Sequence, residues 1–333
     1  MADPVAMVEV WRGGRVESAH AGHAVVCDAA GAVVAAWGDP DLAVYPRSSC
    51  KMVQALPLVE SGAAAGLDDR HLALACASHQ GAALHTGLVA DWLDGLGLAE
   101  TDLRCGAHPP HDRDAAEALI RTGHAPCQLH NNCSGKHAGF LTLARHQRSG
   151  PEYLELDHPV QRAVRAAFEE VTGAPSPGYG IDGCSAPNFV TTLSGLARAM
   201  AGFAAADPAG DARARAMVRL RQAMMRHPEL VAGEGRACTE VMTALGGRGA
   251  VKTGAEAVFV AILPGERPGQ GLGLALKIAD GATRAAEAAL VALLVHLGRL
   301  EAGHPAALRR LGTPVRNWRG IETGHLAAAP GFP

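Results

Sequence analysis

The order of strand-like and helix-like patterns along the chain is the feature that most constrains its fold. Residues 5–17 and 23–37 have the turn signals and composition of two short β-hairpins, and residues 257–263 and 272–278 have strand patterns near the other end. Apolar residues recur mainly at helical spacing from residue 48 to 226, and again at 281–300. This order favours an α+β fold in which both ends of the chain build one antiparallel sheet with flanking helices, beside a mainly helical middle region.

The same order predicts how the chain divides. We expect residues 1–70 and 245–333 to form the sheet-containing part and residues 71–244 the mainly helical part. A doubly wound parallel fold is disfavoured because strands do not alternate regularly with helices. In addition, Gly269, Gly271 and Gly273 lie between two predicted strands and not before a helix.

Composition excludes several functional classes. The 333 residues are 48% hydrophobic, enough for a sizeable core, and a net charge of -3 gives no field that would gather nucleic acid or anionic lipid. We therefore expect no nucleic-acid or membrane partner. The N-terminal residues lack the pattern of a secretory signal, which favours a cytoplasmic location and cysteines that are free or metal-bound instead of disulfide-bonded.

Lysine is scarce in this chain. Of the 30 basic residues only four are lysines, namely Lys51, Lys136, Lys252 and Lys277. Where arginine carries nearly all the positive charge, each lysine is a candidate for a role that needs an amine able to lose its proton, such as a base or a metal ligand.

Ser48 and Lys51 form the first candidate for catalysis. Three residues apart in a helical turn, they face the same side, so the amine can activate the hydroxyl as a nucleophile. The alternative is a helix cap followed by a solvated lysine.

A second lysine motif strengthens the catalytic interpretation. Lys252, Thr253 and Gly254 precede a predicted strand, and penicillin-recognising serine hydrolases combine Ser-x-x-Lys on a helix with Lys-Thr-Gly on a late strand. The third motif of that set, Ser-x-Asn, would correspond to Ser78 and Gln80, with glutamine in place of asparagine. The alternatives are a lysine at a strand edge and a serine that ends a helix.

The chain resembles the Rhizobium etli-type L-asparaginases, whose fold is similar to that of serine β-lactamases and bacterial glutaminases. Six blocks carry the resemblance: YPRSSCK at 45–51, QALPLVESG at 54–62, ACASH at 75–79, NNCSGKHAG at 131–139, GIDGCSAP at 180–187 and VKTGAE at 251–256. The blocks span nearly the whole chain. Two positions depart from the family pattern: Met52, where proline is expected, and Gln80.

The resemblance implies two Ser-Lys pairs. Ser48 with Lys51 would be nucleophile and base, Ser78 with Lys252 a supporting pair, and Asp182 would orient the second pair. From the same blocks we expect three substrate-binding residues, Arg47, Asn132 and His137.

The block at 131–139 also suggests zinc. Spacing alone favours Cys133, His137 and Cys184 as ligands, because thiolates and imidazoles are the usual zinc donors. The resemblance instead implies Cys133, Lys136 and Cys184, with about one zinc per chain. Unmetallated buried cysteines are the remaining alternative, and the role of Cys238 stays open.

These observations predict an amidohydrolase that cleaves L-asparagine to aspartate and ammonia through an acyl-enzyme on Ser48. The alternatives are a glutaminase, a penicillin-recognising serine hydrolase and a non-catalytic zinc-binding protein. A homodimer is implied by the resemblance alone.

Overall fold

The computed structural model describes residues 2–312 and 314–333, and its internal contacts divide the chain into two compact units. The first unit contains Met1–Ser49, Thr191–Ala205 and Glu240–Pro333, and the second contains Cys50–Val190 and Ala206–Thr239. The division expected from the sequence, at residues 70 and 245, concerned folding domains and stays a prediction.

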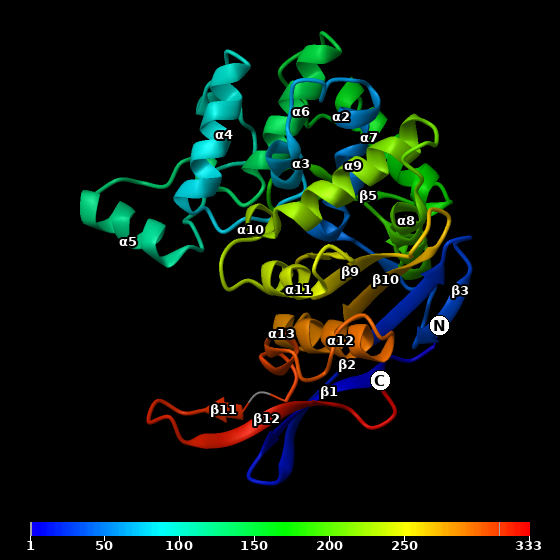
Figure 1. The fold of residues 1–333 in the computed structure, drawn as a ribbon. Helices are drawn as coiled ribbons and strands as arrows, with labels where there is room; N and C mark the ends of the chain where they lie inside the picture. The colour runs from blue at the N-terminus through cyan, green and yellow to red at the C-terminus, as the bar shows by residue number, and fades with distance from the viewer. Residues whose placement is uncertain (1, 313) are drawn as a thin grey trace. The chain divides into compact units, whose positions relative to one another are not determined.

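The first unit is built on an eight-stranded sheet in which every paired strand is antiparallel (Figure 1). The strand order is β11-β12-β1-β2-β10-β9-β8, with β3 also paired to β2. The strands are β1 (Val5–Arg12), β2 (Arg15–Asp28), β3 (Val33–Trp37), β8 (Ala250–Thr253), β9 (Val258–Pro264), β10 (Gly271–Ile278), β11 (Pro314–Arg316) and β12 (Glu322–Ala328). The expected α+β fold, with one sheet from both ends of the chain, is confirmed.

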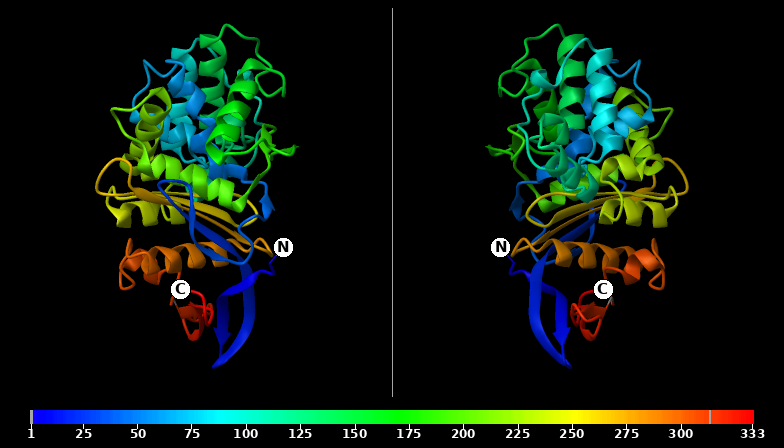
Figure 2. Two further views of the ribbon diagram at one scale, coloured as in Figure 1. Left: turned by 90° about the vertical axis from the view of Figure 1, so that its right-hand side faces the viewer. Right: turned by 90° about the vertical axis from the view of Figure 1, so that its left-hand side faces the viewer.

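Two helices cover the sheet from opposite sides (Figures 1 and 2). Helix α12 (Thr283–His296) contacts β1, β9, β10 and β12, whereas α8 (Leu193–Ala205) contacts β2, β9 and β10. Gly273 permits the close approach of α8, because a Cβ there would lie 2.1 Å from the carbonyl oxygen of Ala197. The unit also contains α13 (Pro305–Leu308) and the short pair β4 (Ala43–Val44) and β7 (Thr191–Thr192).

The second unit is mainly helical. Its helices are α1 (Lys51–Gln54), α2 (Leu56–Glu60), α3 (Asp69–Ala75), α4 (Ala83–Gly95), α5 (Arg113–Thr122), α6 (Ser134–His146), α7 (Pro159–Thr172), α9 (Ala212–Arg226) and α10 (Pro228–Val231), with a small hairpin of β5 (Tyr179–Ile181) and β6 (Pro187–Phe189). Helix α11 (Ala237–Leu245) spans the boundary between the units.

Helix α6 is the core of the second unit. It is buried from Ser134 to Ala144 and contacts α2, α3, α4 and α7. A Cβ at Gly135 would lie 2.5 Å from the carbonyl oxygen of Leu74, so glycine allows the start of α6 to pack against the end of α3. This packing brings together the two segments that carry Ser78 and Cys133.

Two local expectations needed correction. The helical spacing that begins at residue 48 does not start as one continuous helix: the chain forms a 3₁₀ helix, η1 (Arg47–Cys50), then α1 and α2, with a break at Ala55. Pro57, at the start of α2, cannot donate the hydrogen bond that would continue α1. In addition, the two expected N-terminal hairpins share one long strand, β2. Within the described residues, no helix is both long and apolar enough to cross a membrane.

Candidate active site

The Ser48 segment is a tight turn at the start of η1. Pro46 provides its carbonyl oxygen to both the backbone N–H and the hydroxyl of Ser49, at 3.1 and 2.7 Å. Arg47 has a φ of 53°, a left-handed conformation that costs a non-glycine residue about 1–3 kcal/mol. Ser48 and Arg47 are half-buried. The turn therefore holds Ser48 in a fixed backbone conformation and leaves its side chain partly accessible.

The Lys-Thr-Gly motif packs directly against this turn. Lys252 lies on β8, is completely buried, and donates to the carbonyl oxygen of Thr253 at 2.7 Å. A Cβ on Gly254 would lie 2.6 Å from the carbonyl oxygen of Pro46 and 3.1 Å from the backbone nitrogen of Ser49. Only glycine fits this contact, so the first unit brings together two motifs that are about 200 residues apart in the sequence.

Within the second unit, Lys51 lies beside Ser78. The Lys51 side chain is completely buried, and its Nζ donates to Ser78 Oγ at 3.1 Å, to Asn132 O at 3.4 Å and to the carbonyl oxygen of Ala77. Ser78 is itself fixed by its backbone N–H, which donates to Val231 O at 2.9 Å. The family resemblance implied a pair of Ser78 with Lys252, and no sequence pattern indicated this contact between Ser78 and Lys51.

His79 joins the Ser78 loop to the start of α6. Its backbone N–H donates to Asn132 O at 3.2 Å, its Nδ1 accepts the N–H of Gly81 at 3.2 Å, and its Nε2 lies 2.9 Å from Ser134 Oγ. Because Nδ1 accepts, the proton of a neutral ring is on Nε2. Complete burial lowers the pKa of His79 well below its ordinary value. No sequence pattern indicated a role for His79, although it directly follows Ser78.

Gln80 uses its amide in a local contact. Its Nε2 donates to Asp112 Oδ2 at 3.0 Å, and the backbone carbonyl oxygen of Gln80 accepts the backbone N–H of Asp112 at 2.8 Å. A Cβ at Gly233 would lie 2.4 Å from Gln80 Cδ, so the side chain is also closely packed. The longer amide at this position thus anchors the loop that follows Ser78.

Asn132 is half-buried at the end of the loop before α6. Its backbone N–H donates to His108 Nε2 at 2.9 Å, and its side-chain oxygen accepts from Cys133 Sγ at 2.9 Å. His108 Nδ1 in turn lies 2.7 Å from Pro109 O, which places the proton of a neutral ring on Nδ1. The structure therefore fixes both the backbone and the side chain of this expected substrate-binding residue.

The expected zinc ligands form a buried cluster in the second unit. Lys136 Nζ lies 3.1 Å from Cys184 Sγ, and Cys133 hydrogen-bonds to Cys184. The bond from Cys133, together with the nearby Lys136 ammonium, lowers the pKa of Cys184 well below its ordinary value even though burial opposes it. Burial lowers the pKa of Lys136, but Cys184 and Cys133 outweigh that effect and raise it. Without metal, the cluster is therefore an ammonium-thiolate pair with a second thiol.

His137 borders this cluster, and its hydrogen bonds indicate which nitrogen carries the proton. The buried Tyr153 hydroxyl accepts the backbone N–H of Arg104 at 2.8 Å and lies 2.9 Å from His137 Nδ1. Donation of the tyrosine proton to Nδ1 satisfies both groups and leaves the ring proton on Nε2, which has no well-formed hydrogen bond among the described residues. Burial lowers the pKa of His137 to about 4.

The donor set fits zinc. Two sulfurs and one amine converge in a dry site next to an orphaned imidazole N–H, and zinc prefers sulfur and nitrogen ligands. Across residues 2–312 and 314–333, no group of three His, Cys, Asp or Glu side chains is arranged to hold a metal. The candidate zinc ligands are therefore the two cysteines together with Lys136. Lys136 and the two cysteines would release protons when a metal binds.

Asp182 lies in the same turn as Cys184. Its backbone N–H donates to Ala186 O at 2.9 Å, its carboxylate accepts the N–H of Gly183 at 2.8 Å, and its charge contributes to the raised pKa of Lys136. Its expected role towards Ser78 and Lys252 stays a prediction. Cys238 is buried at the start of α11.

Comparison with known proteins gave one family match and several structural similarities. The family described as L-asparaginase II matches residues 8–328. No match was found among the curated proteins. One similar solved structure is Mglu in its tris and glutamate form, with 12% sequence identity and a TM-score of 0.46; the match covers 95% of this chain and 66% of that chain. Another is a β-lactamase from Mycobacterium bovis, with 15% identity and a TM-score of 0.45; the match covers 83% of this chain and 94% of that chain. A third is a probable glutaminase from Bacillus subtilis complexed with 6-diazo-5-oxo-L-norleucine, with 10% identity and a TM-score of 0.40; the match covers 84% of this chain and 85% of that chain. This chain spans about two thirds of the length of the Mglu chain.

Proposed function

Because the chain belongs to the L-asparaginase II family and is therefore an amidohydrolase, we propose that it converts L-asparagine to L-aspartate and ammonia through a serine nucleophile. The observation that carries the proposal is the buried Lys51 amine, which lies 3.1 Å from Ser78 Oγ and three residues after Ser48. A lysine in such a position can exchange protons with serine hydroxyls.

Ser48 Oγ attacks the side-chain amide carbon of asparagine, and neutral Lys51 accepts the hydroxyl proton. The C–N bond then breaks as the amide nitrogen takes up that proton and leaves as ammonia, which gives an aspartyl ester on Ser48. Water hydrolyses the ester, with Lys51 again accepting a proton and returning it to Ser48 Oγ. The Ser78 hydroxyl, hydrogen-bonded to Lys51, can relay protons between the amine and the leaving group.

The other site residues have supporting roles in this proposal. Lys252, buried on β8, provides the second amine, and Asp182 orients the second pair. Three side chains bind the substrate: Arg47, Asn132 and His137. Arg47 suits the α-carboxylate of asparagine, since a guanidinium binds carboxylates with two parallel hydrogen bonds.

Cys133, Lys136 and Cys184 would hold a zinc ion. When bound, zinc would replace the ammonium-thiolate pair and join the start of α6 to the turn at 182–186 as one rigid structure. Asn132 directly precedes Cys133 and His137 directly follows Lys136, so the positions of both depend on how the start of α6 is held. The expected homodimer and cytoplasmic location stay predictions.

The test is Ser48→Ala, with Ser61→Ala on the exposed end of α2 as a matched control. We expect Ser48→Ala to reduce ammonia release from asparagine by at least roughly a thousandfold with no change in thermal unfolding, because no core group is lost. Ser61→Ala should retain full activity. Mass spectrometry of a quenched reaction should find the aspartyl adduct on the peptide that contains Ser48. A Ser48→Ala variant that retains a tenth of the turnover would exclude this nucleophile.

Substrate choice is tested separately. Ammonia release is compared for asparagine, glutamine and simple amides, and acylation by a fluorescent penicillin is measured in parallel. Preference for asparagine supports the proposal. Faster ammonia release from glutamine would indicate a glutaminase instead, and acylation of Ser48 by penicillin would indicate a penicillin-recognising serine hydrolase.

A further inference from the structure

The Lys51 amine is held by two segments that are far apart in the sequence. Its acceptors are the carbonyl oxygen of Ala77, Ser78 Oγ at 3.1 Å and Asn132 O at 3.4 Å. The first two belong to the segment that follows α3, and the third belongs to the loop that precedes α6. An amine on a flexible four-carbon stem takes the position that its acceptors give it. The spacing between these two segments therefore determines how Lys51 meets Ser78.

His79 joins the same two segments with two hydrogen bonds. Its backbone N–H donates to Asn132 O at 3.2 Å, so this oxygen serves both His79 and Lys51. With the ring proton on Nε2, the ring donates to the hydroxyl of Ser134, the first residue of α6, at 2.9 Å. That hydroxyl donates in turn to Leu129 O at 3.0 Å, which fixes the direction of both bonds. His79, Ser134 and Leu129 thus form a clamp between the two segments.

The clamp is enclosed on its other sides. His79 Nδ1 accepts the backbone N–H of Gly81 at 3.2 Å, and its ring stacks on that of His85, with centroids 4.9 Å apart and planes inclined by 10°. His85 is itself anchored, because its Nε2 lies 3.0 Å from Glu229 O. His79 and Ser134 are completely buried. A change at either residue therefore removes one partner of a buried hydrogen bond, and the other partner must move to find a new one.

We propose that His79 is a positioning residue of the active site: by its bond to Ser134 it sets the spacing between the two segments that hold Lys51. That spacing determines the geometry in which Lys51 exchanges protons with the Ser78 hydroxyl. In this role His79 acts through Lys51 and takes up no proton itself. The catalytic consequence rests on the proposed serine-lysine chemistry, whereas the clamp is a property of the fold.

Three substitutions separate the roles of the two ring nitrogens. His79→Gln places an amide N–H near the position of Nε2 and can still donate to Ser134, whereas His79→Asn places its amide near Nδ1 and cannot reach Ser134. Ser134→Ala removes the same bond from the opposite side. The kinetic constants are measured with the fastest substrate among asparagine, glutamine and simple amides.

We expect His79→Asn and Ser134→Ala each to lower kcat by about tenfold to a hundredfold with KM changed less than about twofold, because the group that is displaced transfers protons and does not bind the substrate. His79→Gln should retain most of the wild-type kcat. The double variant with His79→Asn and Ser134→Ala should lose no more than either single variant, because both substitutions remove one and the same bond.

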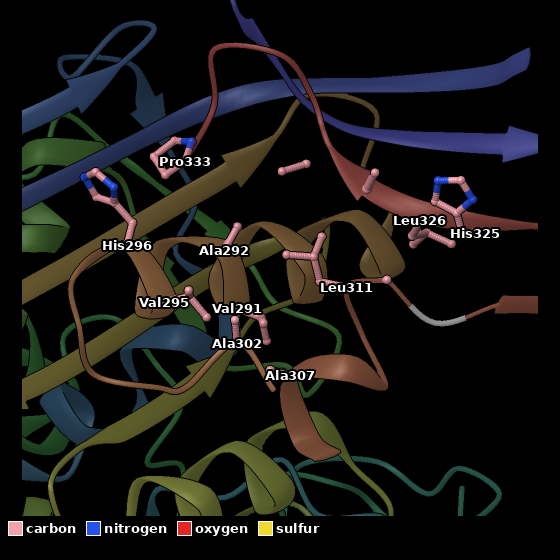
Figure 3. A pocket seen from close by; sticks show the side chains of 13 residues that line it. Val291, Ala292, Val295, His296, Ala302, Ala307, Leu311, His325, Leu326 and Pro333 are labelled. Carbon is pink, nitrogen blue, oxygen red and sulfur yellow. The ribbon is translucent and has the colours of Figure 1, made fainter. Parts of the chain in front are cut away.

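Val291→Ala is the control for a loss of stability alone. Val291 lies on α12 in the first unit, where it is completely buried and lines a cavity of about 430 Å³ (Figure 3). Its truncation enlarges this cavity and should lower Tm by a few degrees, as the broken hydrogen bond should in Ser134→Ala. It should leave kcat unchanged. Equal losses of kcat in Val291→Ala and Ser134→Ala would attribute the effect to stability and overturn the proposal.

Crystal structures of the wild type and of Ser134→Ala give a measurement that needs no substrate. The distance from Lys51 Nζ to Asn132 O should increase by roughly 1 Å in the variant. An unchanged distance, full kcat in His79→Asn, or an equal loss of kcat in His79→Gln would each overturn the proposal. A wild type that hydrolyses no amide would refute the proposed function alone, and a displaced Lys51 amine in Ser134→Ala would still support the clamp.

Discussion

Gly254 should be indispensable for activity because of what surrounds it and not because of its own chemistry. Replacing it with alanine would place a Cβ 2.6 Å from the carbonyl oxygen of Pro46 and 3.3 Å from Ser49 Cβ. The first contact is about 0.8 Å too short for ordinary van der Waals packing. The obstructing atom is backbone, and it already accepts two hydrogen bonds from Ser49, so it cannot move without disturbing the turn that carries Ser48.

The size of the effect follows from this displacement. Forcing one methyl group into a packed site costs about 1–3 kcal/mol, which corresponds to a decrease of a few degrees in Tm for a chain of this size. The effect on catalysis should be larger. A misplacement of about 1 Å in a catalytic group can cost roughly a hundredfold, so we expect kcat/KM for asparagine to fall by about that factor in Gly254→Ala.

The assay must separate misplacement from unfolding. Ammonia release is measured well below the Tm of the variant, where the protein is folded, and Tm is measured on the same preparation. Gly303→Ala is the control, because a Cβ there meets no atom within 4 Å, and it should change neither quantity. Wild-type kcat/KM in Gly254→Ala would refute the conclusion that the Lys-Thr-Gly motif determines the position of Ser48.

Three further predictions concern the remaining groups of the site. Lys51→Arg and Lys252→Arg should each abolish ammonia release, because arginine keeps the charge but cannot accept a proton. Near-wild-type turnover in either variant would show that the lysine replaced in that variant does not act as a proton acceptor. Purified protein should contain about one zinc per chain by elemental analysis, and the Cys133→Ser, Cys184→Ser double variant should contain none; metal-free wild type prepared without chelator would exclude the site. Because burial lowers the pKa of His79, the unfolded state binds a proton below about pH 6.5 that the folded state excludes. The free energy of unfolding, measured by urea denaturation, should therefore decrease from pH 7 to pH 5. His79 should account for up to about 2 kcal/mol of that decrease. His79→Gln should flatten this dependence, and an unchanged slope would show that His79 is protonated in the folded state.

The parts of the fold that were predictable had strong local patterns. The β-branched run that became β9 and the alternation that became β10 identified the late strands, and the apolar segment that became α12 identified the helix that covers them. Strands β11 and β12 were missed because their residues are mostly polar or small and are only partly buried. Strand β12 pairs with β1, a contact between opposite ends of the chain that local composition does not encode, and β11 in turn pairs with β12.

The site likewise has parts that the sequence predicts and parts that it does not. Ser48, Lys51 and Lys252 could be identified as candidates because each belongs to a short motif. The Lys51–Ser78 hydrogen bond could not be predicted, because it depends on how the end of α3 packs against the start of α6. His79 was missed for a related reason: two of its three hydrogen bonds, to Asn132 and Ser134, connect it to a segment more than 50 residues away. Such positioning residues have no sequence signature until the packing is known.

The scarcity of lysine has a structural explanation that supports the catalytic interpretation. Lys51, Lys136 and Lys252 are all buried, and each amine faces backbone carbonyl oxygens, a hydroxyl or a thiolate at hydrogen-bonding distance. Lys277 is half-buried, and its Nζ donates to the carbonyl oxygens of Glu256 and Ile278 at 2.7 and 2.6 Å. An ammonium has three donors and can be satisfied by so few acceptors, whereas a guanidinium has five donors in a fixed plane and would leave some unpaired. Burial therefore favours lysine over arginine at all four positions. In the proposed mechanism, the need for an amine that can lose its proton is a second requirement at Lys51, Lys136 and Lys252 but not at Lys277. Lys277→Arg accordingly tests burial alone: it should lower stability without the loss of activity expected at Lys51 and Lys252.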